Sequence, residues 1–501
     1  MLALKEGTMA KTYWARRDFL KALGAAGLGL SLPSLWGCNS SRKTISSEKP
    51  NIVFILIDDL GWADVGCYGS RYYETPHIDQ LAREGMKFTD GYAACAVCSP
   101  TRASILTGRY PARLGLTDWI RARFQGGKIP PDKKNPTEYV ALPGKKLLCP
   151  PNPLWMELDE ITLAEVLKKA GYVTAHIGKW HLGADDWYPD KQGFDYNIGG
   201  CDFGQPPTYF DPYCNQKQGC IPTLAPRQKG EYLTDRLAEE AVKFIRRHKD
   251  QPFFLYLAHY AVHTPIEGRP DLVAKYEQKE PTHQKNPKYA AMVEAVDQAV
   301  GRVIQVLEET GLTDKTIVFF TSDNGGLIPI TSNKPLRSGK GYPYEGGIRE
   351  PVIIRWPGKI PAGQECSVPI SSIDYFPTIC EAVGVELPSD RVIDGVSLLP
   401  LLTRGEPLKK RALFWHFPHY RGKDIVPYSI IRAGDWKLIK RYEGPTFELF
   451  NLKEDLSETT DLAATYPEKV KELEALLSRW LKEVGAKLPR PNPAFKSSTG
   501  L

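Results

Sequence analysis

The sequence predicts an α/β protein in which a large mixed, mostly parallel β-sheet lies between helices. Four continuous apolar runs, at 51–57, 173–177, 253–257 and 316–320, are rich in branched and aromatic residues and suit strands covered on both faces. Amphipathic helical patterns lie between them, at 162–170, 234–247 and 289–310. Strands that alternate with such helices indicate an α/β fold.

The pattern changes after residue 404. Short strand-like segments at 412–417, 428–433, 436–442 and 448–451 precede one amphipathic helical pattern at 468–484. This arrangement predicts a small antiparallel sheet with a helix against it. We therefore expect a main domain over residues 50–404 and a C-terminal α+β subdomain over residues 405–501.

The first 38 residues have the pattern of an export signal. Basic residues precede an apolar stretch at 22–36, which is shorter than the ~20 residues of a spanning helix. The pair Arg16-Arg17 in this context resembles the twin-arginine consensus, which predicts export by the twin-arginine machinery.

The signal ends in a segment that resembles a bacterial lipobox, with Cys38 as the residue that would carry lipid. A plain cleaved signal is the alternative. Residues 39–49 are polar and would form a tether. We therefore expect a protein exported from a bacterial cell, periplasmic or at the cell surface, whose contact with the membrane is a lipid anchor.

Composition excludes several classes of protein. With 42% hydrophobic and 25% charged residues, the chain is neither disordered nor a polytopic membrane protein. The net charge is +6, but no block of five like charges occurs, so nothing favours nucleic-acid binding. An oxidising compartment would permit disulfides among the ten cysteines, and Cys214 and Cys220 could pair. For Cys67 and Cys380, free buried thiols are equally plausible.

Polar residues follow two of the predicted strands. Asp58 and Asp59 come directly after the first, and Asp323 and Asn324 follow the fourth. Open α/β sheets bind ligands at the carboxyl ends of their strands. Three carboxylates and an amide oxygen form an all-oxygen set that suits Ca²⁺ or Mg²⁺ better than zinc. Taken singly, the first pair could be a helix N-cap and the second a turn. Their occurrence together favours a metal site.

Two further segments carry a family resemblance. Residues 98–109 read Cys-Ser-Pro-Thr-Arg-Ala-Ser-Ile-Leu-Thr-Gly-Arg, and residues 171–181 read Gly-Tyr-Val-Thr-Ala-His-Ile-Gly-Lys-Trp-His. They resemble the first and second signatures of the formylglycine-dependent sulfatases, and the likeness extends from residue 51 to at least residue 402. It implies an alkaline-phosphatase-like fold and a sulfuric ester hydrolase.

In that family a separate maturase oxidises the motif cysteine, here Cys98, to formylglycine, whose hydrate attacks sulfur. A thiolate would instead be trapped as a thiosulfate, whereas a geminal diol can expel sulfate by reforming the aldehyde. Without the resemblance, Cys98 could be a buried thiol or a partner of Cys95.

The resemblance also assigns roles to the other site residues. It implies that Ca²⁺ is held by Asp58, Asp59, Asp323, Asn324 and the modified Cys98. Arg102 would hold the hydrate, and Asp323 would take the attacking proton. Lys179 and Lys340 would bind the sulfate oxygens. His263, with Lys340, would protonate the leaving alcohol, and His181 would release sulfate by deprotonating the second hydroxyl. A lone lysine is otherwise more often a solvated surface charge.

Substrate recognition is less specified. Arg113, His416 and His419 are the substrate-binding candidates, together with Trp119, Arg121, Arg123 and Arg421; aromatic and basic residues suit an anionic sugar, although ordinary loop packing is an equal alternative. A likeness around residues 61–62 and 74–76 favours galactose or N-acetylgalactosamine sulfates of a polysaccharide. The rival functions are a phosphonate or phosphate-diester hydrolase of the same superfamily and a non-catalytic lipoprotein that binds sulfated glycans.

Overall fold

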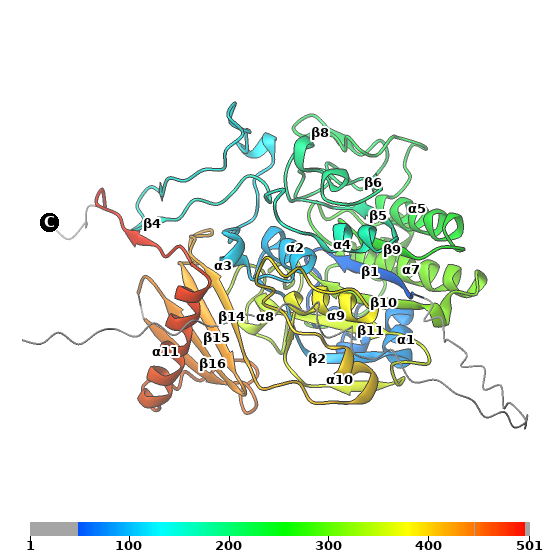
Figure 1. Cartoon of the computed structure of the whole chain (residues 1–501). Coiled ribbons are helices and arrows are strands. Elements are labelled where there is room, and N and C mark those ends of the chain that lie inside the picture. Colours follow the sequence, from blue (N-terminus) through cyan, green and yellow to red (C-terminus); the bar gives the residue numbers. More distant parts are fainter. Residues whose placement is uncertain (1–48, 445, 496–501) are drawn as a thin grey trace, which may run out of the picture. The chain divides into compact units, whose positions relative to one another are not determined.

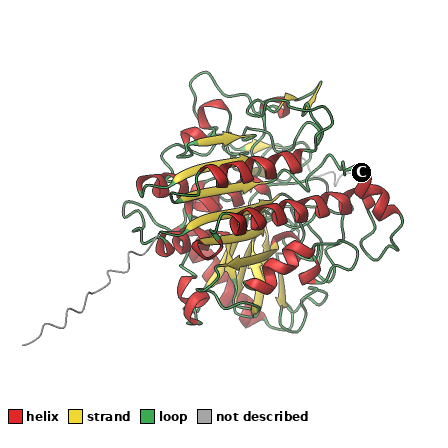
Figure 2. Ribbon diagram, turned by 90° about the vertical axis from the view of Figure 1, so that its right-hand side faces the viewer, coloured by secondary structure: helices red, strands yellow, loops and turns green. Residues whose placement is uncertain are grey.

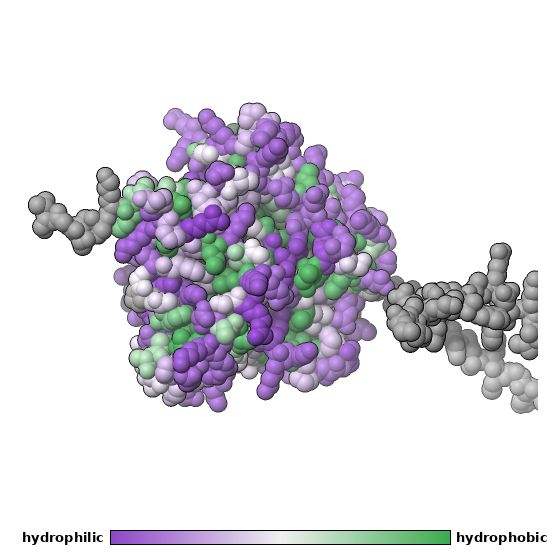
Figure 3. Space-filling model, turned by 60° about the vertical axis from the view of Figure 1, so that its left-hand side comes forward, coloured by the Kyte–Doolittle hydropathy of each residue, from purple (hydrophilic) through white to green (hydrophobic). Residues whose placement is uncertain are grey.

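The computed structural model describes residues 49–444 and 446–495. The predicted signal, Cys38 and nearly all of the predicted tether lie outside these residues. No helix in the described ranges is long and apolar enough to cross a membrane. On the face shown in Figure 3, hydrophobic residues are scattered among hydrophilic ones.

A nine-stranded sheet is the centre of the described part (Figure 1). Its strands run in the order β12-β2-β11-β10-β1-β9-β5-β6, and β13 also pairs with β2. In chain order the strands are β1 (Asn51–Ile57), β2 (Met86–Tyr92), β5 (Val173–Gly178), β6 (Tyr196–Ile198), β9 (Phe253–Ala258), β10 (Thr316–Ser322), β11 (Arg349–Arg355), β12 (Gln364–Cys366) and β13 (Ile370–Ser371). All neighbours are parallel except β11, which is antiparallel to both β10 and β2.

Helices pack over the sheet, and Figure 2 shows them layered against its strands. The helices of the described part are α1 (Pro76–Glu84), α2 (Cys98–Thr107), α3 (Pro111–Leu114), α4 (Leu163–Lys169), α5 (Leu233–Arg247), α6 (Pro270–Glu277), α7 (Pro287–Glu309), α8 (Glu345–Ile348), α9 (Tyr375–Ala382), α10 (Leu399–Arg404) and α11 (Pro467–Glu483), the last of which lies against the C-terminal sheet. Helices α1, α5 and α6 contact α7, whereas α2 and α4 contact α9. Every residue of β1 is buried, as expected for a strand covered on both faces.

Three smaller sheets complete the described part. The four strands β14 (Ala412–Phe417), β15 (Tyr428–Ala433), β16 (Trp436–Arg441) and β17 (Phe447–Asn451) form an antiparallel sheet that contacts α11. Strands β3 (Val140–Ala141), β4 (Leu147–Cys149) and β18 (Arg490–Pro491) form a second, and β7 (Cys214–Asn215) pairs with β8 (Gly219–Cys220). A disulfide joins Cys214 to Cys220, as the sequence allowed, while Cys67 and Cys380 are free.

The predicted fold class is confirmed. Each of the four predicted parallel strands and each of the four C-terminal strands forms within two residues of the expected bounds. Strands β2 and β11 were not predicted. In β11 the adjacent charged residues Arg349 and Glu350 and the following Pro351 interrupt the apolar pattern. The strand also has an irregular register between Glu350 and Val352.

Strand register brings the predicted polar residues together. Ile57 lies opposite Ser322, and Ala258 lies opposite both Leu56 and Gly178. Because β5, β9, β1 and β10 are parallel, their carboxyl ends meet at one edge of the sheet. Backbone hydrogen bonds beyond the strands extend this alignment, for example from Asp58 N to the Ala261 carbonyl at 2.9 Å.

A buried lysine ties the C-terminal sheet to the segment that precedes β11. Lys437, in β16, lies 2.9 Å from Glu345 Oε1 and 2.7 Å from Glu458 Oε1, and all three side chains are fully buried. Residues 338–344 form a loop that contains Lys340, called the Lys340 loop below. Glu345, the first residue of α8, directly follows this loop. The C-terminal sheet therefore supports a segment next to the predicted site.

Replacing Lys437 tests this attachment. Lys437→Met leaves the buried Glu458 without its cation and leaves Glu345 with Arg349 alone, so we expect a loss of about 3–5 kcal/mol in the free energy of unfolding, measured by urea denaturation. The control is Lys471→Met, because Lys471 is exposed and pairs with Glu468 on the surface of α11. We expect a change of less than about 1 kcal/mol there. Equal stability of the two variants would contradict the assignment.

Candidate active site

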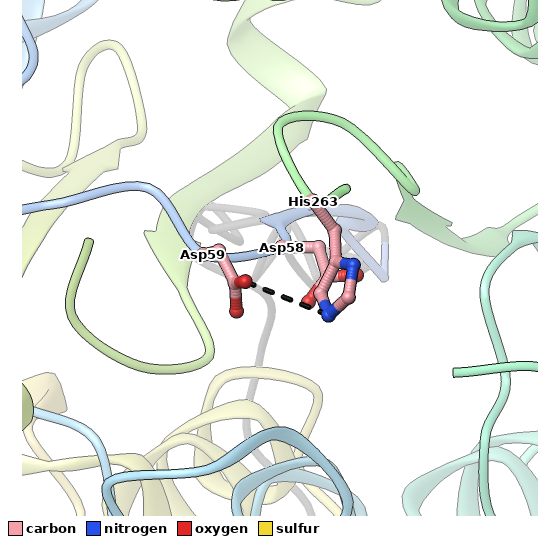
Figure 4. Close-up of side chains that lie close together, drawn as sticks. All are labelled: Asp58, Asp59 and His263. Carbon is pink, nitrogen blue, oxygen red and sulfur yellow. Dashed lines mark ion pairs between the residues drawn. The ribbon is translucent and has the colours of Figure 1, made fainter. Parts of the chain in front are cut away.

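Side chains from four strand ends meet at the carboxyl edge of the sheet. Asp58 and Asp59 follow β1, Lys179 follows β5, His263 follows β9 and Asp323 follows β10. Figure 4 shows His263 beside the two aspartates, with its Nε2 atom 3.6 Å from Asp59 Oδ2. The four charged side chains are 0–2% exposed and His263 is 15% exposed. The site is thus almost completely removed from water.

Three cations balance the three carboxylates. Lys179 Nζ lies 2.6 Å from Asp58 Oδ2, and Arg102 Nε donates to Asp323 Oδ2 at 2.8 Å. Lys340 donates to Asp59 Oδ1. Since removing a charge from water costs several kcal/mol, each of these groups requires its partner.

The environment separates the pKa values of the three carboxyl groups. Burial, reinforced by Asp323 and Asp59, raises the pKa of Asp58 well above its usual value despite Lys179. Burial acts in the same direction on Asp59, but Lys340 and His263 outweigh it and lower its pKa. The pKa of Asp323 is also lowered, because Arg102 and Lys179 outweigh burial.

The oxygen atoms in this cluster fit a hard cation. Asp58 Oδ1, Asp59 Oδ2 and Asn324 Oδ1 are buried and have no hydrogen-bond partner. Ligand atoms of Asp58, Cys98 and Asp323 lie within 4.8 Å of one another. Buried oxygens without partners are costly, and a bound cation with oxygen ligands removes that cost. The four sequence-predicted metal ligands are therefore together and chemically suited to Ca²⁺ or Mg²⁺.

Helix α2 brings Cys98 and Arg102 to the cluster. Cys98 is its first residue, at the end where the helix dipole is positive, and every residue of the helix is buried. Arg102 lies four residues later and so shares a face with Cys98. Besides Asp323, it donates through Nη1 to the Lys179 carbonyl at 2.8 Å. Cys98 does not pair with Cys95, since both are free.

His181 is held in an unusual position. Its backbone is in the left-handed region, with φ of 60°, and its Nε2 lies 2.7 Å from the Ile120 carbonyl. Gly204 packs on the ring so closely that a Cβ there would lie 2.6 Å from Cε1. Burial lowers the pKa of His181 well below its usual value, and burial likewise lowers that of His263 to about 3. Both rings are therefore neutral when the site holds only protein groups.

The roles of Ile120 and Gly204 were not predicted. A backbone carbonyl on an apolar loop residue leaves no sequence signal. Gly204 is required by the ring of His181, which comes from another segment, so the sequence does not distinguish it from other loop glycines.

The Lys340 loop closes over α2. Lys340 N donates to the Gly326 carbonyl at 3.1 Å, and Gly341 N donates to the Ala96 carbonyl at 2.8 Å. Ala96 precedes Cys98 by two residues. Although burial opposes it, Asp59 and Cys98 raise the pKa of Lys340. Lys340 is therefore a buried cation that faces the same cluster.

Each of the three predicted substrate-binding residues contacts another group of the protein. Arg113 is held by Asp394, with Nη2 to Oδ1 at 2.7 Å, and His416 Nδ1 lies 2.7 Å from the Ser429 hydroxyl. These contacts engage both side chains within the protein. His419 Nε2 lies 2.8 Å from the Thr117 hydroxyl, and His419 lines a cavity of about 230 Å³. The substrate-binding role of all three residues remains a prediction.

Comparison with known proteins decides the family. The family model described as Sulfatase matches residues 50–385. This chain belongs to the sulfatase family. It is a sulfuric ester hydrolase with the alkaline-phosphatase-like fold of its relatives. A second model, for the C-terminal part of N-sulphoglucosamine sulphohydrolase, matches residues 339–487.

Similar proteins cover most of this sulfatase. A sulfatase of Formosa agariphila is 35% identical over 88% of this chain and 89% of its own length. The N-acetylgalactosamine-6-sulfatase of Sus scrofa is 36% identical over 87% of this chain and 78% of its own length. The crystal structure of Ps i-CgsB in complex with k-i-k-neocarrahexaose has a TM-score of 0.73 and 30% identity, covering 90% of this chain and 96% of that chain.

Metal binding can be tested without measuring activity. Adding Ca²⁺ to EDTA-treated protein should raise the melting temperature. An ion present at 100 times its Kd stabilises a protein by about 2.7 kcal/mol. Asp323→Asn removes one ligand charge and should reduce the shift. Asp435→Asn is the matched control because Asp435 lies in an exposed turn. A full calcium-dependent shift in Asp323→Asn would exclude this residue as a ligand.

Proposed function

We propose that this sulfatase removes a sulfate ester from a carbohydrate, using formylglycine formed from Cys98 and Ca²⁺ held by Asp58, Asp59, Asp323 and Asn324. The observation that carries the proposal is the position of Cys98, whose sulfur lies within 4.8 Å of carboxylate oxygens of Asp58 and Asp323. Those carboxylates are surrounded by three buried cations that suit an anionic substrate.

The modified residue and the metal would supply the reactive groups. Formylglycine at position 98 would supply a geminal diol, with one hydroxyl as the nucleophile and the other able to expel sulfate, and Ca²⁺ held by the four ligands would supply positive charge. The overall reaction consumes one water and yields the free sugar hydroxyl and hydrogen sulfate.

The chain's own residues position and stabilise the sulfate. Lys179 and Lys340 bind its oxygens in a site without bulk water, where charge stabilisation contributes most. Arg102 orients residue 98 from one turn further along α2, and Asp323, held by Arg102, accepts the attacking proton.

Two histidines complete the proton transfers. His263, with Lys340, donates a proton to the leaving alcohol. The pKa of His263 is low without substrate, and the negative charge of a bound sulfate favours its protonated form. His181 accepts a proton from residue 98, which its neutral ring suits. Its hydrogen bond to Ile120 and its contact with Gly204 fix the orientation of the ring.

For the substrate we propose a galactose or N-acetylgalactosamine sulfate of a polysaccharide. The support is the 36% identity to an N-acetylgalactosamine-6-sulfatase and the likeness of fold to Ps i-CgsB, whose structure contains k-i-k-neocarrahexaose. The rival function is a phosphate-diester hydrolase of the same superfamily. Assaying a phosphate diester beside the sulfated sugars tests it.

For the cellular route we propose export through the twin-arginine system, with lipid on Cys38. We place the maturase reaction on Cys98 in the cytoplasm, because twin-arginine export carries folded proteins and folding buries this thiol, which is 3% exposed. Peptide mass spectrometry of the unexported precursor tests this order, and an unmodified Cys98 there would contradict it.

Cys98→Ala tests the chemistry. We expect the variant, coexpressed with a maturase, to keep the wild-type melting temperature and to release no inorganic sulfate from sulfated galactan or glycosaminoglycan oligosaccharides. Cys95→Ala is the control, as Cys95 is buried, free and three residues away; it should remain active. Full activity of Cys98→Ala would refute the mechanism. Cleavage of the diester alone by the wild type would favour the rival hydrolase.

Lys340→Ala tests charge stabilisation. Removing one group that stabilises transition-state charge typically lowers kcat by about 10²–10³-fold. Lys334→Ala, an exposed lysine of the preceding loop, is the matched control and should retain wild-type kcat. A similar kcat in the two variants would show that Lys340 does not contact the sulfate.

A further inference from the structure

Arg421 lies at the edge of the site and belongs to the C-terminal subdomain. It follows β14 in a turn closed by two backbone hydrogen bonds with Ile425, at 3.1 and 3.3 Å. Its side chain is half-buried. The turn therefore holds Arg421 in place, while the exposed Lys423 lies at its tip.

The stem of Arg421 packs directly on Gly341. A Cβ at position 341 would lie 2.8 Å from Arg421 Cδ and 2.9 Å from Nε. Gly341 has a φ of +87° and follows the sulfate-binding lysine, and its N–H donates to the Ala96 carbonyl. Glycine is required there for the backbone and for the close approach of the arginine. The guanidinium is therefore held next to Lys340.

Within the described part of the chain, Arg421 forms no ion pair, although it lies close enough to Asp118 to act against the rise that burial causes in the pKa of that carboxyl group. In residues 49–444 and 446–495, no carboxylate forms an ion pair or hydrogen bond with its side chain. Arg102 is paired with Asp323, whereas within the described residues Arg121 likewise forms no ion pair and lies over the Trp119 ring. At this edge of the site three cations, Lys340, Arg421 and Arg121, are accompanied by two carboxylates. Asp59 pairs with Lys340, and Asp118 lies near the two arginines. This excess of positive charge favours an anion.

The cavity beside Arg421 has a lining that suits a sugar. It measures about 230 Å³ and is lined by Asp118, Trp119, Arg121 and the two residues before Arg421, His419 and Tyr420. The Trp119 ring lies 6.5 Å from the His181 ring, so the cavity adjoins the site, and the Arg121 guanidinium lies 5.8 Å from the Trp119 ring. An indole offers a face for the apolar side of a sugar ring.

We propose that Arg421 determines specificity by binding a second anionic group, a sulfate ester or a carboxylate, on the sugar that enters the cavity beside the scissile sulfate. This inference rests on the proposed function and narrows its substrate class to sugars with more than one negative charge. A guanidinium suits either anion, because its paired N–H groups match two oxygen atoms.

Kinetics on matched substrates test the proposal. We would compare a monosulfated N-acetylgalactosamine with a disulfated one and with a monosulfated disaccharide that carries a uronic acid. Arg421→Ala should lower the ratio of kcat/KM for the doubly charged over the singly charged sugar by about tenfold to a hundredfold, mainly through KM. Arg421→Lys should restore part of this ratio, and Lys423→Ala, from the same turn, should keep the wild-type ratio. The two doubly charged substrates distinguish sulfate from carboxylate.

Binding to Cys98→Ala separates this inference from the proposed function. Calorimetry with the same three sugars requires no turnover. Weaker binding of a doubly charged sugar in Cys98→Ala/Arg421→Ala than in Cys98→Ala supports the role of Arg421 even if no sulfate is ever released. The proposal is overturned if the kcat/KM ratio, or the affinity for a doubly charged sugar, is the same with and without Arg421. It is also overturned if no doubly charged sugar binds.

Discussion

The rest of the site depends on the neutralisation of three carboxylates in a place that water does not reach. Asp58, Asp59 and Asp323 are paired with Lys179, Lys340 and Arg102, and no member can be removed without leaving a buried charge unpaired. The partners come from β5, from the Lys340 loop and from α2, which are far apart in the sequence. The charge balance therefore links the folding of these segments to one another.

Much of this arrangement could be predicted from local sequence. Strand ends such as Ile57 and Ser322 are marked by an apolar run that stops at charged or amide residues, and parallel pairing places those residues together. The spacing of Cys98 and Arg102 is a helical turn. In contrast, the partners of Arg113 and His416 lie 281 and 13 residues away. Nothing in the sequence near these residues indicates such contacts, so the groups that engage the substrate-binding candidates could not be predicted.

The direction of β11 shows a similar limit. The strand contains Glu350 and Pro351, which are unusual inside a sheet, and its neighbours β10 and β2 come from opposite ends of the main domain. Its place is set by pairing over long sequence separations, with an irregular register at the proline. The family resemblance covers the residues around β11 but did not predict that they form a strand.

The burial of α2 has a consequence for the timing of biosynthesis. Cys98 is 3% exposed in the folded chain, yet Asp323, which pairs with Arg102 on the same helix, is synthesised about 225 residues later. At roughly 5–20 residues per second, translation leaves about 10 to 45 s during which α2 has emerged and its charge partner does not yet exist. During this interval Arg102 cannot be buried as an ion pair with Asp323, so the segment stays accessible. The ribosome thus provides a period in which another enzyme can reach the thiol.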